Sequence, residues 1–317
     1  MRLVMTLLCR DEADIVDCMI AYHLAEGVDH IIATDNGSVD GTREILCKWR
    51  DYGVLHLIDE PPGAYLQDKW VTRMARLAAK SYDADWVINA DADEFFLCRS
   101  ARLKEALSRL DDSTMAIAVK RHDFVPFDRA EVLPPPMEMP YRKAHSLNDL
   151  KGTPLPPKVI HRASPEVKVS MGNHGVSGKG FPASPEYADI ELFHYPKRSL
   201  AQFQLKIRNG GKSMSLNTRM SSQQRWNVFY REELEGKLEE RYLREMHFSR
   251  DDLSSQLAQG SLVEDDLLIK KLTRIRRDME IEGLEAFEKK DIEVGTLAKL
   301  KRRLQQMFFK KSPRLKS

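Results

Sequence analysis

The sequence has few cysteines and no long apolar segment. Its four cysteines are Cys9, Cys18, Cys47 and Cys98, and no Cys-x-x-Cys pair occurs. This spacing argues against a zinc site and against a disulfide framework, and it predicts a reducing, cytoplasmic location. No run of 18 apolar residues occurs, so we expect no transmembrane helix. The apolar residues 1–9 are followed at once by charged residues, which predicts a buried strand rather than a signal peptide.

The chain also lacks a large excess of charge of either sign. It carries 50 basic and 48 acidic residues, a net charge of +2 over 317 residues. Such a balance gives no electrostatic argument for a nucleic-acid partner, and we expect none. An apolar content of 42% is ordinary for a folded protein, and the length allows one large domain with an appendage.

Strand and helix patterns alternate over the first hundred residues. Continuous apolar runs predict buried strands, and apolar positions at helical spacing predict the helices between them. The predicted strands are 3–8, 30–34, 54–58 and 86–88, and the predicted helices are 14–25, 40–50 and 66–81. This order predicts right-handed crossovers and an α/β fold, with a mostly parallel sheet flanked by helices.

The pattern changes after residue 100. One more strand is predicted at 115–119, and residues 122–195 are rich in proline and glycine, as binding loops often are. Helix formers dominate from residue 199 onward. We therefore expect one α/β domain over residues 1–235 and a charged helical extension over residues 236–317.

Two acidic residues follow the strand at 86–88. Asp91 and Asp93 stand two residues apart, and side chains at this spacing in an extended segment point the same way. They can then converge on one Mg²⁺ or Mn²⁺ ion that bridges to a phosphate, beyond the carboxyl end of the strand. The alternative is a turn with solvated carboxylates. Apolar residues on both sides, at 87–88 and 95–97, favour a half-buried pair that needs a counter-ion.

Four segments carry a resemblance to a known family. They are Arg10-Asp11-Glu12, the turn from Asp35 to Thr42, the run from Trp86 through Asp91-Ala92-Asp93-Glu94-Phe95, and His194-Tyr195. Over about residues 1–210 the chain resembles family 2-type glycosyltransferases, in the divergent branch with an Asp-x-Asp-Glu-Phe segment. The resemblance implies the GT-A nucleotide-diphospho-sugar transferase fold. It also implies transfer of a sugar from a nucleotide-diphosphate donor to an acceptor hydroxyl, with inversion.

The resemblance further implies roles for particular residues. The metal, Mn²⁺ or Mg²⁺, is expected on Asp91, Asp93 and His194. The expected contacts of the donor nucleotide sugar are Arg10, Glu12, Asp35, Asn36, Lys69, Asp91 and Lys206. Most family members have a second acidic residue in the turn after the second strand, where this chain has Asn36. The structural alternatives are a turn with a helix cap at 35–42 and a buried, satisfied imidazole at His194.

The acidic motif that usually supplies the general base in this family is missing from the sequence. The residue that deprotonates the acceptor hydroxyl therefore stays open. Its candidates are Glu94, Asp123, Asp128, Asp189 and Glu191. Two rival functions also stay open: a nucleotidyltransferase, and an inactive GT-A domain that acts as a binding module. A nucleotidyltransferase would want a glycine-rich loop and a lysine after the first strand, where this chain has Arg10-Asp11-Glu12. The segment Gly210-Gly211-Lys212-Ser213 fails as a phosphate-binding loop, because its earlier glycine is missing.

The end of the chain combines an apolar stripe with basic residues. The stripe consists of Leu297, Leu300, Leu304, Met307 and Phe308, and no acid follows residue 296. Residues 296–311 are thus expected to form a basic amphipathic helix. It can lie on the inner face of an anionic membrane, or pack on the domain or on a second subunit. The expected acceptor is a glycan, a lipid-linked sugar or a polysaccharide.

Overall fold

The computed structural model describes residues 1–61, 63, 66–129, 131–148, 151–181, 185–215 and 225–281. Its centre is an eight-stranded sheet of order β3-β2-β1-β4-β8-β6-β11-β5. The strands are β1 (Leu3–Cys9), β2 (His30–Asp35), β3 (Leu55–Asp59), β4 (Trp86–Asp91), β5 (Glu94–Cys98), β6 (Ala116–Asp123), β8 (Lys158–Arg162) and β11 (Glu186–His194). The neighbours β3, β2, β1 and β4 are parallel, as are β6 and β11, whereas β8 and β5 run antiparallel to their neighbours. The predicted α/β fold with a mainly parallel sheet is confirmed.

Helices cover both faces of the parallel half of the sheet. They are α1 (Val16–Ala25), α2 (Thr42–Asp51) and α3 (Gln67–Ser81), and the short α4 (Leu103–Ser108) follows β5. Alternate residues of β1 serve the two faces: Leu3, Met5 and Leu7 belong to the core with α1 and α2, while Val4 and Leu8 pack with α3. A strand covered on both faces is apolar at every position, which explains the continuous run at the start of the sequence.

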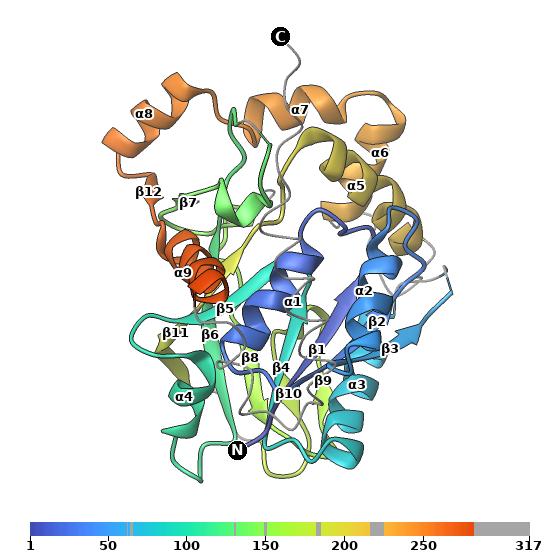
Figure 1. Cartoon of the computed structure of the whole chain (residues 1–317). Helices are drawn as coiled ribbons and strands as arrows, with labels where there is room; N and C mark the ends of the chain where they lie inside the picture. Colours follow the sequence, from blue (N-terminus) through green and yellow to red (C-terminus); the bar gives the residue numbers. More distant parts are fainter. Residues whose placement is uncertain are drawn as a thin grey trace.

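The second half of the chain adds short strands and further helices. The two-stranded pieces pair β7 (Tyr141–Lys143) with β12 (Leu262–Glu264), and β9 (Lys168–Val169) with β10 (Val176–Ser177). The helices are α5 (Leu200–Ser215), α6 (Arg225–Leu234), α7 (Leu238–Glu245), α8 (Arg250–Ala258) and α9 (Leu267–Ile281). In Figure 1, α5, α6 and α7 lie above the end of the sheet where β1 and β4 finish.

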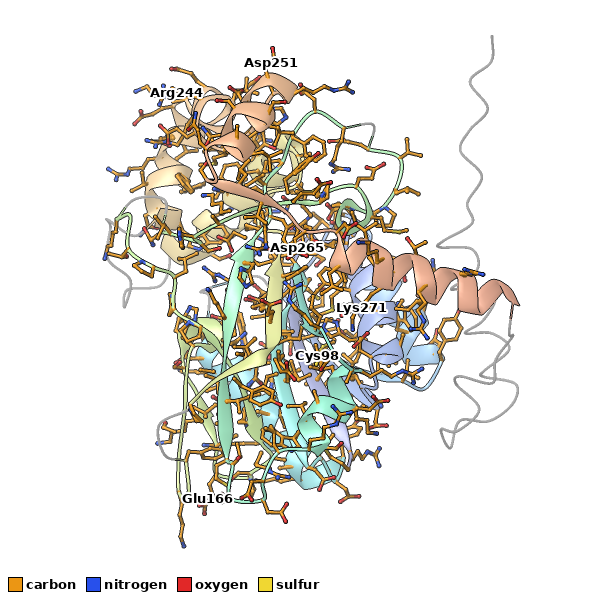
Figure 2. The ribbon with its side chains drawn as sticks, turned by 90° about the vertical axis from the view of Figure 1, so that its left-hand side faces the viewer. Cys98, Glu166, Arg244, Asp251, Asp265 and Lys271 are labelled. Carbon is orange, nitrogen blue, oxygen red and sulfur yellow. The ribbon has the colours of Figure 1, made fainter. Side chains whose placement is uncertain are left out.

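Residues 236–281 pack closely on the rest of the chain. Leu268 and Leu272 of α9 belong to the main core, and Lys271 Nζ lies 2.9 Å from Glu26 Oε1 of the α1 region. Asp265 binds Arg142 and Arg99, each at 3.0 Å, beside the β7–β12 pair (Figure 2). The division expected at residue 235 stays a prediction. No helix among the described residues is both long and apolar enough to cross a membrane.

Candidate active site

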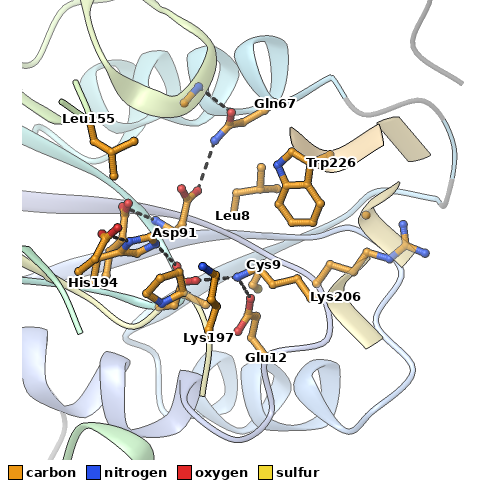
Figure 3. A pocket seen from close by; sticks show the side chains of 18 of the residues that line it. Leu8, Cys9, Glu12, Gln67, Asp91, Leu155, His194, Lys197, Lys206 and Trp226 are labelled. Carbon is orange, nitrogen blue, oxygen red and sulfur yellow. Dashed lines mark hydrogen bonds and ion pairs between the residues drawn. The ribbon is translucent and has the colours of Figure 1, made fainter. Parts of the chain in front are cut away.

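A pocket of about 890 Å³ opens at the carboxyl ends of β1 and β4. Its floor includes the end of β1, the β4–β5 turn and the start of β8, and its roof comes from α5 and α6. Ligands of open α/β sheets bind at this edge, because the strand ends and the loops after them meet there. Figure 3 shows the side chains that line the pocket.

The acidic pair sits in a tight turn. Asp91 ends β4, Ala92 and Asp93 form the turn, and Glu94 begins β5. The two aspartates therefore face different partners: Asp91 accepts hydrogen bonds from Gln67 and Lys158, while Asp93 Oδ2 lies 2.6 Å from Lys206 Nζ. A turn replaces the extended segment that was expected, and the convergence of Asp91 and Asp93 on one ion stays a prediction. Within the described ranges, no three acidic, histidine or cysteine side chains gather to hold a metal.

His194 lies next to Asp93, although a hundred residues separate them. It ends β11, and its Nε2 is 3.6 Å from Asp93 Oδ1 while its Nδ1 is 2.7 Å from Asp123 Oδ1. Burial lowers the pKa of His194, but the negative charges of Asp93 and Asp123 outweigh it and raise this pKa above 6.5. Burial raises the pKa of Asp93, but Lys206 and His194 hold it well below its usual value.

This pair of side chains fits a hard divalent ion. Adjacent ligands of an octahedral ion with bonds near 2.1 Å lie about 3 Å apart, and Mg²⁺ is usually held by one or two carboxylates plus substrate phosphate. The distance between Asp93 and His194 is close to this value. Asp123 supplies the second carboxylate that commonly orients a metal-binding histidine. Asp93 and His194 are thus the residues that would hold the metal.

Lys158 is a buried cation that the sequence analysis did not identify. Its side chain is 2% exposed, and its Nζ lies 3.0 Å from Asp91 Oδ2 and 2.7 Å from Glu94 Oε1. Burial lowers its pKa, but these two carboxylates more than compensate and raise it. The pKa of Glu94 is raised by burial, in spite of Lys158. The only sign in the sequence is a lysine that opens an apolar strand, and such a residue is ordinarily interpreted as solvent-exposed.

Helix α5 is tied to the loop after β1 by charged side chains. Lys206 Nζ bridges Glu12 Oε1 at 2.9 Å and Asp93 Oδ2 at 2.6 Å. Arg198, which is fully buried, binds Asp14 at 2.7 Å and also Glu12, and it does not itself line the pocket. Burial lowers the pKa of Lys206, but Asp93 and Glu12 outweigh it and raise this pKa. Arg10 and Glu12, expected at the donor, do line the pocket.

The turn after β2 brings one of its two expected residues to the pocket. Asn36 lines it and is 1% exposed; its Nδ2 donates to the carbonyl of Pro61, while its Oδ1 is buried without a partner. Asp35 instead accepts hydrogen bonds from Ser38 and shapes the turn. Burial raises the pKa of Asp35, and the bonds from Ser38 partly offset this rise. Asn36 is thus the residue of this turn that can contact a ligand.

Besides Asp35, four expected residues lie outside the pocket lining. Lys69 is exposed on α3 and borders a separate hollow with Arg73, Arg76 and Lys80. Asp189 binds Ser100, Glu191 binds Arg99, and Asp128 lies 3.5 Å from His247. Asp189 and Glu191 precede the end of β11 by five and three residues, about 17 and 10 Å along a strand, so they lie away from the edge where the pocket opens. Of the candidate bases, Glu94 and Asp123 do line it.

Comparison with known proteins identifies the class of this chain. Residues 11–237, more than two thirds of the chain, match glycosyltransferase family 92. The chain therefore belongs to glycosyltransferase family 92. The expected activity class is confirmed, whereas the assignment to family 2 is not. Comparison with curated proteins gave no match.

Two solved structures illustrate how distant the structural relatives are. Residues 1–349 of S. aureus TarS in complex with UDP-GlcNAc are 13% identical to this chain with a TM-score of 0.39, over 97% of this chain and 90% of that one. Glucosyl-3-phosphoglycerate synthase from Mycobacterium tuberculosis, in complex with Mn²⁺, UDP-glucose and phosphoglyceric acid, is 18% identical with a TM-score of 0.28, over 39% of this chain and 44% of that one. At these scores we draw no argument from either likeness.

Proposed function

We propose that this chain is a metal-dependent glycosyltransferase that moves a sugar from a nucleotide-diphosphate donor to an acceptor hydroxyl, with inversion at the sugar. The observation that carries the proposal is the meeting of Asp93 and His194 at the pocket, with Lys206 beside them. A bound Mn²⁺ or Mg²⁺ would neutralise charge on the leaving diphosphate. Lys206 supplies a protein cation at the same place, and the acceptor is a glycan, a lipid-linked sugar or a polysaccharide.

The acceptor hydroxyl needs a base within the pocket. Glu94 and Asp123 both line it, but their environments differ. Burial raises the pKa of Glu94, whereas His194 and Arg121 outweigh burial and hold the pKa of Asp123 below its usual value. A base works best when its pKa approaches the working pH, so we favour Glu94.

The rival functions fit less well. A nucleotidyltransferase would hold a triphosphate with a glycine-rich loop and a lysine after β1, but the loop here carries Asp11 and Glu12, and Glu12 is bound to Arg198 and Lys206. An inactive binding module has no need to keep two acids and a histidine at the pocket. Membership of glycosyltransferase family 92 also favours sugar transfer.

The test measures release of nucleotide diphosphate by the full chain from a panel of sugar nucleotides, with a mixture of glycan acceptors, in Mn²⁺ or in EDTA. We expect release from one or a few donors that requires the metal and is lost in Asp93→Asn. The matched control is Asp128→Asn, which removes the same charge outside the pocket and should leave release unchanged. Release that persists in EDTA and in Asp93→Asn would contradict the metal assignment. Pyrophosphate release from a nucleoside triphosphate and a sugar phosphate would establish the rival activity.

A further inference from the structure

Trp226 is the one tryptophan among the described residues that line the pocket, and it packs at the edge of the apolar cluster that includes Phe203, Ile207 and Phe229. The chain has four tryptophans. Trp49 and Trp86 are fully buried and Trp70 is 7% exposed, whereas Trp226 of α6 is only partly buried and lines the pocket. Figure 3 shows it beside Leu8, on the side of the pocket away from His194. An indole left at the wall of a polar pocket offers a flat surface that a ring-shaped ligand can cover.

Two glycines inside α5 hold this indole in place. Glycine is unfavourable in a helix interior, so Gly210 and Gly211 need a packing reason. A Cβ at Gly210 would lie 2.9 Å from Trp226 Cζ3, and a Cβ at Gly211 would lie 2.6 Å from Tyr230 Cβ. Side chains do not approach one another so closely. Glycine at these two positions therefore allows α6 to pack directly against α5. The six-membered ring of Trp226 is therefore supported from below before any ligand arrives.

The position of Trp226 along α5 indicates which part of a ligand it meets. Gly210 lies between Asn209, which donates to Asp11 at 2.6 Å, and Ser213, which accepts from Arg10 at 2.8 Å. Gly210 thus lies next to the part of α5 that binds the loop after β1, and Figure 3 shows the indole beside Leu8, near the end of β1. Lys206, which faces Asp93, precedes Gly210 by about one helical turn, or about 6 Å. The expected phosphate position near Lys206 and the ring position near Gly210 are therefore separated by roughly the length of a ribose.

A nucleobase would also supply a hydrogen-bond donor to a buried oxygen of the pocket. Asn36 Oδ1 is buried, lines the same pocket and has no partner, so it needs an N–H or O–H donor. A nucleobase offers both an N–H edge and a π face, whereas a sugar ring has no π face. We propose that Trp226 is the stacking surface for the base of the donor nucleotide and that Asn36 Oδ1 accepts a hydrogen bond from the edge of that base. This assignment rests on the proposed function, because it presumes a nucleotide donor.

Intrinsic tryptophan fluorescence and calorimetry of the full chain with Mn²⁺ test the assignment. The ligands are UDP, CDP, ADP and GDP, with pyrophosphate as the ligand that lacks a base. We expect the bound nucleotide to quench the fluorescence of the natural protein and of Trp70→Phe, but not of Trp226→Phe, which still binds. Trp226→Ala should bind the nucleotide roughly 5- to 150-fold more weakly, the range for loss of one stacked base, and should bind pyrophosphate as before.

Each contrary result has a separate meaning. Quenching that survives in Trp226→Phe, or an equal loss of nucleotide and pyrophosphate in Trp226→Ala, would overturn the stacking role and leave the proposed function standing. Quenching by acceptor sugars but not by nucleotides would overturn it as well. If calorimetry finds no nucleoside diphosphate that binds the natural protein, the proposed function fails, and the base site fails with it.

Discussion

At the scale of single residues, the pocket pairs each of its buried acids with an internal cation. Lys158 forms ion pairs with Asp91 and Glu94. Lys206 forms ion pairs with Asp93 and Glu12. Buried charges need such partners, because desolvation without compensation is very costly. The pairing has a consequence for metal binding: Lys206 on Oδ2 and a divalent ion on Oδ1, beside His194, would compete for the negative charge of the same carboxylate, Asp93.

The substitution Lys206→Met should separate these two roles. Without nucleotide, the variant should bind Mn²⁺ more tightly than the natural protein, because Asp93 is released from its ammonium partner. It should bind a nucleoside diphosphate roughly 10- to 100-fold more weakly, since a charge-assisted contact is lost. Calorimetry measures both affinities, and Lys69→Met, which lies outside the pocket, should change neither. A weaker affinity for Mn²⁺ in Lys206→Met would contradict the competition.

The sequence predicts part of this site. Asp93 was identified from its position after an apolar strand and His194 from the family resemblance, and their side chains do meet. Lys158 was not identified, and the pairing of Arg198 was not predicted, because the acidic partners Asp91 and Asp14 lie 67 and 184 residues away. Only the tertiary fold determines such pairings. The turn at Ala92 and Asp93 was not predicted either, since periodicity cannot show that the chain bends there.

At the scale of elements, Arg198 joins the loop after β1 to the segment that leads into α5. Its guanidinium is fully buried and binds Asp14, Glu12 and the carbonyl of Tyr195. We expect Arg198→Met to lower the free energy of unfolding by about 1–3 kcal/mol, because it removes one of the two cations bound to buried Glu12 and leaves the buried carbonyl of Tyr195 without this donor. Urea unfolding measures this. The matched control Arg244→Met breaks exposed pairs with Glu240 and Glu245 and should cost much less. Equal effects of the two substitutions would be inconsistent with this role of Arg198.

His23 links α1 to β5 and makes stability depend on pH. Its Nδ1 lies 2.9 Å from the carbonyl of Met19, and its Nε2 accepts from the backbone N–H of Phe96 at 3.1 Å, so the ring is held neutral. Burial lowers the pKa of His23 to about 4. The unfolded chain then takes up the proton first, so this stability is complete above pH 6.5 and is lost as the pH falls toward 4.

The matched variant is His23→Gln, which keeps a donor and an acceptor but does not titrate. Between pH 7 and pH 5 the natural protein should lose about 2 kcal/mol more unfolding free energy than the variant. Urea unfolding at both pH values measures the difference. An identical loss in the two proteins would show that His23 is not responsible.

The regular elements were the most predictable part of the fold. The predicted strands and helices of the first hundred residues all occur, with ends moved by one to three residues, because buried parallel strands and amphipathic helices have strong patterns. The pairing of β7 with β12 was not predicted. Each strand has three residues, and about 120 residues separate them, so no local pattern marks the pair.

At the scale of the whole molecule, the segment expected to contact a membrane, residues 296–311, lies outside the described residues. We propose that it binds an anionic membrane surface, since each basic residue near such lipid contributes up to about 1 kcal/mol and the apolar stripe can insert. The enzyme would then be cytoplasmic and peripheral at the inner face. Co-sedimentation with vesicles should require anionic lipid, fade with salt and be lost when residues 296–317 are deleted. A full-length chain that stays in the supernatant at low salt would refute the proposal.

The central claim is that the pocket binds a nucleotide diphosphate together with a divalent metal on Asp93 and His194. Calorimetry of the full chain with a panel of nucleoside diphosphates, with and without Mn²⁺, tests it most directly. The account predicts that one base is bound at least 10-fold more tightly with Mn²⁺, and that Asp93→Asn abolishes this enhancement while Asp128→Asn keeps it. Nucleotide binding of equal strength with and without Mn²⁺, or an enhancement that survives in Asp93→Asn, would contradict it.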